Sequence, residues 1–454
     1  MQRNRRRLLA TLRHVGSYIS LLCCVATAHA DGLEDRLVKV HQANDSASTR
    51  TSVFPEDYRI TSDRKDDAPS INRAISAACT SQRAVRLSSR TYQIDTPIVQ
   101  ANCHVSVLGA GWQEPAGGTI SSGTILHVTF LTKPIIQITG NSSSGSVWSD
   151  IAAYEDQPEV AREWKPRNYG YLFDVESIGG GITIQHIMCM NCTLGAKIHV
   201  AGRTVVRDFF GQFFDNEIDA DKNFDGSVID NARNWPWWSQ SPYVLSYQIS
   251  NLDTFILGRE DDLQSSNLFT YGARSGLKLI TTPGEECINK LCKVPGGSAT
   301  MIHIGLAKFE ACKSGIWSTT SPSYFDEGSI RIDFFSYQGQ DPSVTTPVSI
   351  STASAIKEDG WQTQISVGLL KADFIDKYLI DDTNGTAATN FIIDAAFLDF
   401  SHGQSVTYYL NTPKYPSTVA IGIVPQVYAP YPIQNTPQPP DSRGSVSWPL
   451  LTPR

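Results

Sequence analysis

Beyond its first 30 residues, the 454-residue sequence lacks any run of about twenty apolar residues, the length that a membrane-spanning helix needs. It also lacks a basic excess. Without those 30 residues, 33 of the 38 lysines and arginines remain against all 45 aspartates and glutamates, a formal charge of about −12. Because nucleic-acid phosphates bind to a basic face, this composition argues against nucleic acid as a partner. The missing apolar runs argue against stable membrane insertion.

A complete set of zinc ligands is missing as well. The CxxC at 189–192 has neither a second CxxC nor a nearby histidine pair, so we expect no metal there. The other cysteines predict at least two disulfides in an oxidising compartment, Cys79 with Cys103 and Cys287 with Cys292. Three cysteines have no predicted partner: Cys189, Cys192 and Cys312.

Residues 1–30 have the features of a signal peptide. Five arginines lead into a short apolar stretch, and Ala28-His29-Ala30 offers a small-x-small cleavage site. We therefore predict that the mature chain begins at Asp31 and is secreted or periplasmic. The alternative is an uncleaved membrane anchor. Residues 31–56 form an N-terminal leader.

The remaining sequence predicts one helix followed by many short strands. "DDAPSINRAISAAC", residues 66–79, has acidic residues and a proline at its start and apolar residues at helical spacing. After it, "AVRLSSRTYQIDTPIV" and "HVSVLGAG" alternate apolar and polar residues between glycines and prolines, a pattern typical of strands. After about residue 404 the chain becomes proline-rich, so we expect 405–454 to be a separate C-terminal segment.

A weak internal repeat underlies these strands. Five segments share an apolar strand, a bend and a second alternating strand, and the second strands begin near residues 196, 217, 277, 316 and 377. The offsets between successive second strands lie close to multiples of twenty residues. Because no such unit can bury its apolar side alone, the units are expected to stack.

The stretch "DDAPSINRAISAAC…AVRLSSRTYQIDTPIVQANCHVSVLGAGW" resembles the start of the pectate-lyase-like right-handed β-helix superfamily, in which a helix caps the first coil. The resemblance covers about residues 57–112 and fades over 113–400. It implies a single-stranded right-handed parallel β-helix over 57–404 with an N-terminal capping helix, and a homotrimer is compatible with it. The superfamily includes lyases, hydrolases, epimerases and phage tailspikes, so it does not fix the chemistry.

The catalytic signatures of polygalacturonase-like members appear only as fragments. "DNEID" and the Asp261-Asp262 pair match two of them loosely. His303-Ile304-Gly305 lacks the first glycine of a third, and Arg331-Ile332-Asp333 ends in aspartate where that family has lysine. We therefore carry none of those roles over to this chain.

The spacing within the repeat suggests a site instead. In "EIDAD", alternation predicts that Glu217, Asp219 and Asp221 point outward. With a coil of twenty residues, Lys197 would lie beside Glu217 and His199 beside Asp219. Such carboxylates serve as acid and base in glycoside hydrolysis. In a lyase, Lys197 would be the base and the carboxylates would bind Ca²⁺. The alternative is a solvated ladder of charges without chemistry.

A neighbouring loop, "DKNFDG" at 221–226, resembles half of an EF-hand, but position twelve is Ala232, which disfavours an EF-type calcium site.

Aromatic and basic residues near this strand are candidates for sugar binding. In "NWPWW" the same count of twenty places tryptophans on the coil after the carboxylates, where a pyranose ring could stack on them. The alternative is a buried plug at a turn. Arginines could pair with a uronate or sulfate. The candidate substrate-binding residues are Trp235, Trp237, Trp238, Arg233, Arg259, Asp261 and Arg274.

We conclude from the sequence that the chain is an exported β-helix protein acting on a polysaccharide, with hydrolysis slightly favoured over elimination. The alternative, from another class, is a non-catalytic protein that binds polysaccharide or takes part in surface assembly.

Overall fold

The structure is a computed structural model of the chain. It describes residues 52–177, 179–283, 285–286, 293–294, 297–299, 301–321, 328–339, 353–360, 363–375, 378–382, 389–399, 408–411, 418–428 and 445–447. The predicted signal peptide, the leader up to residue 51, Cys287 and Cys292 lie outside the described residues, so export and the second predicted disulfide stay predictions.

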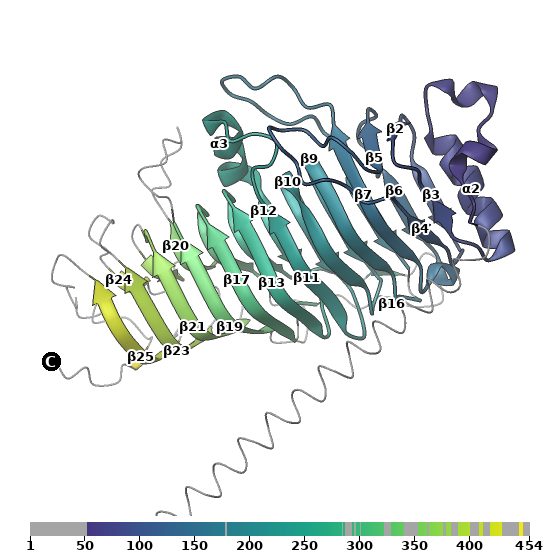
Figure 1. The fold of residues 1–454 in the computed structure, drawn as a ribbon. Coiled ribbons are helices and arrows are strands. Elements are labelled where there is room, and N and C mark those ends of the chain that lie inside the picture. The colour runs from purple at the N-terminus through teal and green to yellow at the C-terminus, as the bar shows by residue number, and fades with distance from the viewer. Residues whose placement is uncertain are drawn as a thin grey trace, which may run out of the picture. The chain divides into compact units, whose positions relative to one another are not determined.

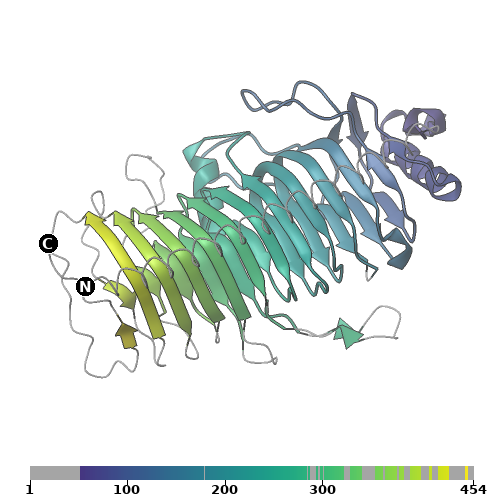
Figure 2. The same ribbon diagram turned by 60° about the horizontal axis from the view of Figure 1, so that its bottom comes forward.

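The chain forms the predicted right-handed parallel β-helix, whose strands stack along one axis (Figure 1, Figure 2). Every pairing between named strands is parallel except the short hairpin of β15 (Glu285–Glu286) and β16 (Lys293–Val294). Each coil contributes to three faces, because the chain bends twice within a coil and then turns into the next coil.

Face 1 is built from short strands and from the first parts of longer ones. These are β1 (Val85–Arg86), β4 (Ser106–Leu108), β7 (Val147–Glu155), β9 (Thr183–His199), β10 (Val205–Asp221), β11 (Ser227–Asn234), β13 (Leu263–Tyr271), β17 (Ile302–Glu310), β19 (Gly328–Gln338), β21 (Thr363–Asp373), β23 (Asn390–Asp399), β25 (Thr418–Tyr428) and β26 (Ser445–Ser447).

Face 2 begins with β2 (Thr91–Ile94) and β5 (Ile125–Val128) and continues through the later parts of the strands from β7 to β25. Face 3 consists of the last parts of β9 and β10 together with nine further described strands. These are β3 (Ile98–Ala101), β6 (Ile136–Thr139), β8 (Tyr171–Glu176), β12 (Asp253–Leu257), β14 (Ser275–Ile280), β18 (Ser314–Thr319), β20 (Ser354–Glu358) and β22 (Tyr378–Asp381), after which β24 (Tyr408–Asn411) completes the face.

Strands β24 to β26 thus continue the stack after residue 404, within the proline-rich segment 405–454.

The predicted helix is present as α2 (Ala68–Ser81), which covers the N-terminal end of the stack (Figure 1). It follows two 3₁₀ turns, η1 (Pro55–Tyr58) and η2 (Thr61–Arg64), and a third, η3 (Asn141–Ser143), precedes β7. Proline lies in the first turn of α2, where no helical N–H is lost. Asp66 accepts a hydrogen bond from the Ala68 amide at 3.0 Å. Its apolar side is fully buried against the first coils, so the helix closes the end of the core.

A disulfide ties this cap to the first coils. Cys79 at the end of α2 pairs with Cys103, as predicted. Cys189 and Cys192, left open by the sequence, form a second disulfide inside the stack. Cys312 is a buried free thiol, and burial raises its pKa to about 12.

The interior consists of columns of like residues from successive coils. On face 3, one column runs Ala196, Ile218, Phe255, Leu277, Ile316, Ile356 and Ile380. The repeat starts proposed near residues 196, 217, 277 and 316 therefore fall on strands of face 3, while residue 377 lies outside the described residues. Between β10 and β14 the chain forms β11, the helix α3 (Pro242–Asn251), β12 and β13, and of these strands β12 belongs to face 3. The segment is therefore not a series of plain coils of twenty residues.

The bend between faces 1 and 2 depends on a left-handed residue in four successive coils. Asp150, His186, Asp208 and Asn231 have φ between 50° and 63°. In this region a β-branched side chain is strained, whereas glycine is not.

We therefore expect Asp208→Val to lower the free energy of unfolding by about 1–2 kcal/mol more than Asp208→Gly does. Chemical denaturation of both variants measures the difference. Arg207→Val, one residue earlier on the strand, is the control and is expected to cost little. Equal stability of the valine and glycine variants would contradict the bend geometry.

Candidate functional site

The candidate site lies on face 3, where outward side chains of successive coils form a column. Asp174 of β8 pairs in register with Lys197 of β9, and Lys197 pairs with Asp219 of β10. The offset from Lys197 to Asp219 is 22 residues, not the predicted twenty. Asp219 therefore occupies the place that the sequence gave to Glu217.

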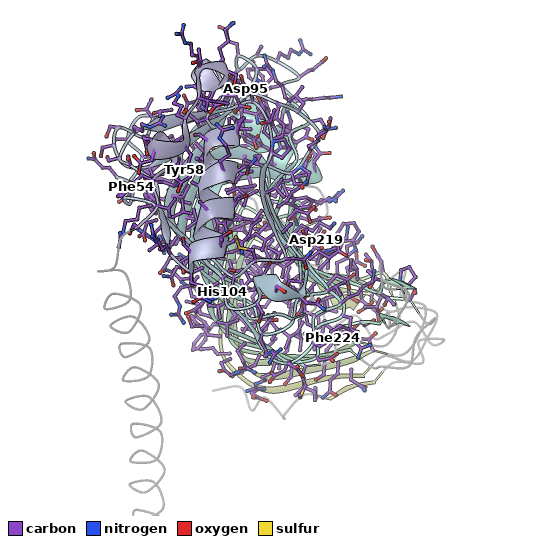
Figure 3. The ribbon with its side chains drawn as sticks, turned by 90° about the vertical axis from the view of Figure 1, so that its right-hand side faces the viewer. Phe54, Tyr58, Asp95, His104, Asp219 and Phe224 are labelled. Atoms are coloured by element: carbon purple, nitrogen blue, oxygen red, sulfur yellow. A yellow bond between two sulfur atoms is a disulfide. The ribbon has the colours of Figure 1, made fainter. Side chains whose placement is uncertain are left out.

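Asp219 is partly exposed, and its carboxylate has two hydrogen-bonding partners. His199 Nε2 lies 3.0 Å from one carboxylate oxygen, and the Tyr171 hydroxyl lies 3.1 Å from the other. His199 is thus a close neighbour of Asp219, as predicted, although in register it pairs with Asp221. In Figure 3, which looks along the stack from the α2 end, Asp219 lies to one side of α2.

Lys197 is paired with a carboxylate on its other side. Its Nζ lies 3.5 Å from Asp174 Oδ1, and both side chains are partly exposed. The charges of the column therefore alternate from Asp174 through Lys197 to Asp219. Each side chain lies beside one of opposite charge, which is favourable for neighbouring strands.

A third carboxylate, Asp215, lies at the bend before this part of β10. Burial raises its pKa, and a hydrogen bond from the Tyr247 hydroxyl of α3 at 2.7 Å offsets part of that effect. Burial and the negative charges of Asp219, Asp174 and Asp215 together raise the pKa of Tyr171. The Tyr171 phenol therefore contacts Asp219, and the charges of Asp174 and Asp215 also act on it.

Tyr171, Asp174, Asp215 and Tyr247 are not among the residues that the sequence predicts for the site. The alternation of "FDVE" carried a signal for Asp174, but the assumed coil length of twenty placed no neighbour there.

Towards the C-terminal end the same face becomes basic. The Asp219 column continues through Ile256 and Lys278 to Trp317 and Lys357. Three cations surround the Trp317 ring: Lys278 Nζ at 4.6 Å, Lys357 Nζ at 4.7 Å and the Arg274 guanidinium at 5.3 Å from its centroid.

Two carboxylates hold these cations in place. Asp253 accepts hydrogen bonds from Arg274 Nε at 2.8 Å and Lys278 Nζ at 2.7 Å, while Lys357 pairs with Asp359. Burial alone would raise the pKa of Asp253, but these two cations outweigh it and lower the pKa. Arg274, a predicted binding residue, therefore lies on this face. The sequence did not predict Lys278, Trp317 and Lys357 as binding residues.

The predicted outward position of Glu217 is wrong. Its side chain is 0% exposed, and burial raises its pKa well above the ordinary value, although the Arg233 backbone amide lowers it slightly. Neither carboxylate oxygen has a well-formed hydrogen bond among the described residues. The pairing of β10 with β9 is irregular between Gly211 and Asn216, directly before Glu217, and Asn216, Glu217 and Ile218 are all buried in succession instead of alternating.

Asp221 is also buried rather than exposed, at 1%. It accepts hydrogen bonds from the Arg259 amide at 2.9 Å and the Thr282 hydroxyl at 2.8 Å, which belong to the turns of the next two coils. A side chain at Gly258 would collide with its carboxylate. Asp221 therefore joins successive turns instead of facing a substrate.

A second buried carboxyl, Glu260, belongs to this turn. It accepts a hydrogen bond from Asn223 Nδ2 at 2.5 Å, and Asn223 also bonds the backbone at residues 198 and 201. Burial, aided by the charges of Asp221 and Asp261, raises the pKa of Glu260 to about 8.

The raised pKa makes stability depend on pH. Because folded Glu260 holds its proton up to about pH 8 while the unfolded chain releases it near its ordinary value of 4.5, stability is lost as the pH rises through this window. We expect Glu260→Gln to make that loss shallower in denaturation at pH 5, 6.5 and 8. Glu163→Gln removes an exposed carboxyl and is the control. Identical slopes for Glu260→Gln and the wild type would argue against a protonated Glu260.

The three tryptophans of "NWPWW" do not stand beside Asp219. They follow β11 at the end of face 2, whereas the neighbour of the Asp219 strand is β12. Trp237 packs with Phe210 and Met188, and Trp238 packs with Trp164 and Phe214. These two tryptophans therefore fasten the loop to the coils, as the plug alternative expected.

We expect Trp237→Ala to lower the free energy of unfolding by about 3–5 kcal/mol, because the indole fills a packed apolar cluster. Thermal and urea denaturation measure this loss. Tyr243→Ala removes an aromatic ring that is 40% exposed on α3 and should change stability by less than ~0.5 kcal/mol. A Trp237→Ala variant as stable as the Tyr243→Ala control would show that the indole is no plug.

The remaining predicted binding residues are dispersed. Arg259 pairs with Asp261 at 2.9 Å and lies over the Phe224 ring at the turn between faces 3 and 1. Arg233 and Trp235 lie on face 2. The proposed single groove of tryptophans, arginines and carboxylates is therefore wrong, because twenty residues is not the coil length here.

Within the part of the chain that the structure describes, no three His, Cys, Asp or Glu side chains are grouped as metal ligands. Neither described α-helix is long and apolar enough to cross a membrane.

No protein-family model matches the sequence, and no curated protein sequence matches it. Solved structures are similar in fold. The catalytic domain of a GH87 α-1,3-glucanase is 12% identical at a TM-score of 0.43, with 83% of this chain and 66% of that one covered. PfbA, a surface adhesin of Streptococcus pneumoniae, is 10% identical at a TM-score of 0.41, with 82% of this chain and 91% of PfbA covered.

An Acinetobacter phage tailspike protein is 10% identical at a TM-score of 0.36, with 82% of this chain and 59% of the tailspike covered. This chain thus spans less than two thirds of the glucanase domain and of the tailspike. At these identities the similarity concerns the coiled fold, and the activity has to be argued from the site.

Proposed function

We propose that the chain is an exported glycoside hydrolase that cleaves a polysaccharide lying along face 3, parallel to the stack. The observation that carries the proposal is Asp219, a partly exposed carboxylate that contacts the Tyr171 hydroxyl and His199, with Asp174 and Asp215 near enough for their charges to act on the same phenol. Glycoside hydrolysis requires two carboxyl groups in different protonation states, and unlike surroundings provide them.

Asp215 suits the role of general acid, since burial raises its pKa and keeps it protonated to higher pH. Its proton would pass to the glycosidic oxygen as the bond from that oxygen to the anomeric carbon breaks. Asp219, oriented by Tyr171 and His199, would accept a proton from the water whose oxygen bonds to the same carbon. Asp174 and Lys197 would then hold the sugar hydroxyls beside them.

The basic end of face 3 supports a polysaccharide that carries negative charge. Trp317 offers a ring for stacking, and Lys278 and Lys357 beside it could contact carboxylates or sulfates. Elimination from a uronate, with Lys197 as base and Ca²⁺ on the carboxylates, is the alternative chemistry, and it would produce an unsaturated uronate with its own ultraviolet absorbance.

We expect Asp219→Asn and Asp215→Asn each to lower the rate of reducing-end release from a cleaved polysaccharide by about 10²–10⁴. A panel of neutral and acidic polysaccharides, followed by viscosity, first identifies the substrate. The wild-type rate should fall as the pH rises through the elevated pKa of Asp215, because the acid must be protonated. The Asp215→Asn variant should lack that dependence.

Asp230→Asn removes a carboxylate from face 1, where Asp230 pairs with Arg207, and is the matched control with unchanged activity expected. Retention of the panel polysaccharides without any cleavage would replace the hydrolase with the non-catalytic binding protein of the sequence analysis. Full activity in Asp219→Asn would reject the site.

A further inference from the structure

A second surface with features of carbohydrate recognition lies on face 2. It consists of outward side chains from β10, β11, β13 and β17 and the residue after β11, and we call it the aromatic–arginine strip: Phe210, Arg233, Trp235, Phe269, Tyr271 and Lys308.

The strip alternates rings and cations along the stack. In register, Phe210 is followed by Arg233, then by Phe269 and then by Lys308. The Arg233 guanidinium lies 5.9 Å from the Phe210 centroid and 5.6 Å from that of Phe269, and Lys308 Nζ lies 5.5 Å from Phe269. Trp235 extends the strip sideways, with its ring 5.8 Å from Phe269.

Arg233 is the exposed member of the strip. Among the described residues, no carboxylate lies within ion-pair distance of its guanidinium, whereas Lys308 is paired with Glu310 at 2.7 Å. The two rings lie within cation–π range of the guanidinium and attract it without neutralising its charge. The strip therefore presents one positive charge without a carboxylate partner among the described residues, on an aromatic surface.

The strip is separate from the site on face 3. Phe210 and Arg233 precede the bend that leads to face 3, whereas Asp219 and the basic end around Trp317 follow it. The two surfaces face different directions of the same coils.

We propose that the aromatic–arginine strip is a second carbohydrate-binding surface, specific for a polysaccharide that bears carboxylate or sulfate groups. Sugar rings would stack on Trp235 and Phe269 through their C–H faces, and an anionic substituent would accept two hydrogen bonds from the Arg233 fork. Successive coils are about 4.8 Å apart, close to the length of one pyranose residue, so a chain lying along the stack meets equivalent positions repeatedly. The proposal does not depend on catalysis at face 3.

Affinity electrophoresis of the full chain tests this surface, with dextran and dextran sulfate as probes because they share one backbone. We expect retardation by dextran sulfate, and about tenfold weaker binding in Arg233→Ala. Arg233→Lys keeps the charge but lacks the planar fork, so we expect it to be intermediate. Arg203→Ala, which removes an exposed arginine at the turn between faces 3 and 1, is the charge-matched control and should bind as the wild type.

Equal loss in Arg233→Ala and Arg203→Ala would overturn the proposal, because it would show attraction to overall charge. A fall in the solution mass of the protein on Arg233→Ala would also overturn it, since the strip would then be an interface between copies of the chain. Asp219→Asn should keep the Arg233-dependent retardation. A failure of hydrolysis at face 3 is therefore distinguishable from a failure of this surface.

Discussion

Every feature of this molecule depends on one constraint: a single coil cannot bury its own apolar side chains, so each coil must stack on the next in a fixed register. The parallel hydrogen bonds between coils place Asp174, Lys197 and Asp219 side by side although 22 or 23 residues separate neighbours in the sequence. The chemistry of the outward surfaces is therefore set by the register.

The turns fix that register with buried polar groups. Asp221 bonds the turns of two further coils, and Asn223 connects backbone on one side to Glu260 on the other. These groups explain why carboxylates that looked exposed in the sequence are structural. Glu260, hydrogen-bonded to Asn223 and kept protonated by desolvation, joins coils as a neutral group.

Two outward surfaces result from the same stacking, and they differ in charge arrangement. On face 3, acids gather near Tyr171 and cations gather near Trp317, each cation being held by a carboxylate. On face 2, rings alternate with cations, and Arg233 has no such carboxylate among the described residues. The arrangement on face 3 suits proton transfer at one end and polysaccharide binding at the other, whereas the arrangement on face 2 suits binding alone.

The sequence by itself determined the elements that depend on local pattern. The α2 cap follows from its proline, acidic start and helical spacing, and the repeat starts near 196, 217, 277 and 316 mark the strands of face 3. It also indicated that His199 and Asp219 are neighbours. The residue after a stacked inner position points outward, so the same repeat contained the signal for Lys278 and Trp317.

Only the tertiary structure decided the coil length, and with it the site. A shift of two residues moved Asp219 into the place given to Glu217, and the bend in β10 and the next turns buried Glu217 and Asp221. In the segment between β11 and α3, Trp237 and Trp238 lie in packing clusters away from Asp219. The physical reason is that alternation fixes sidedness within one strand, whereas neighbours across coils depend on the length of every intervening turn.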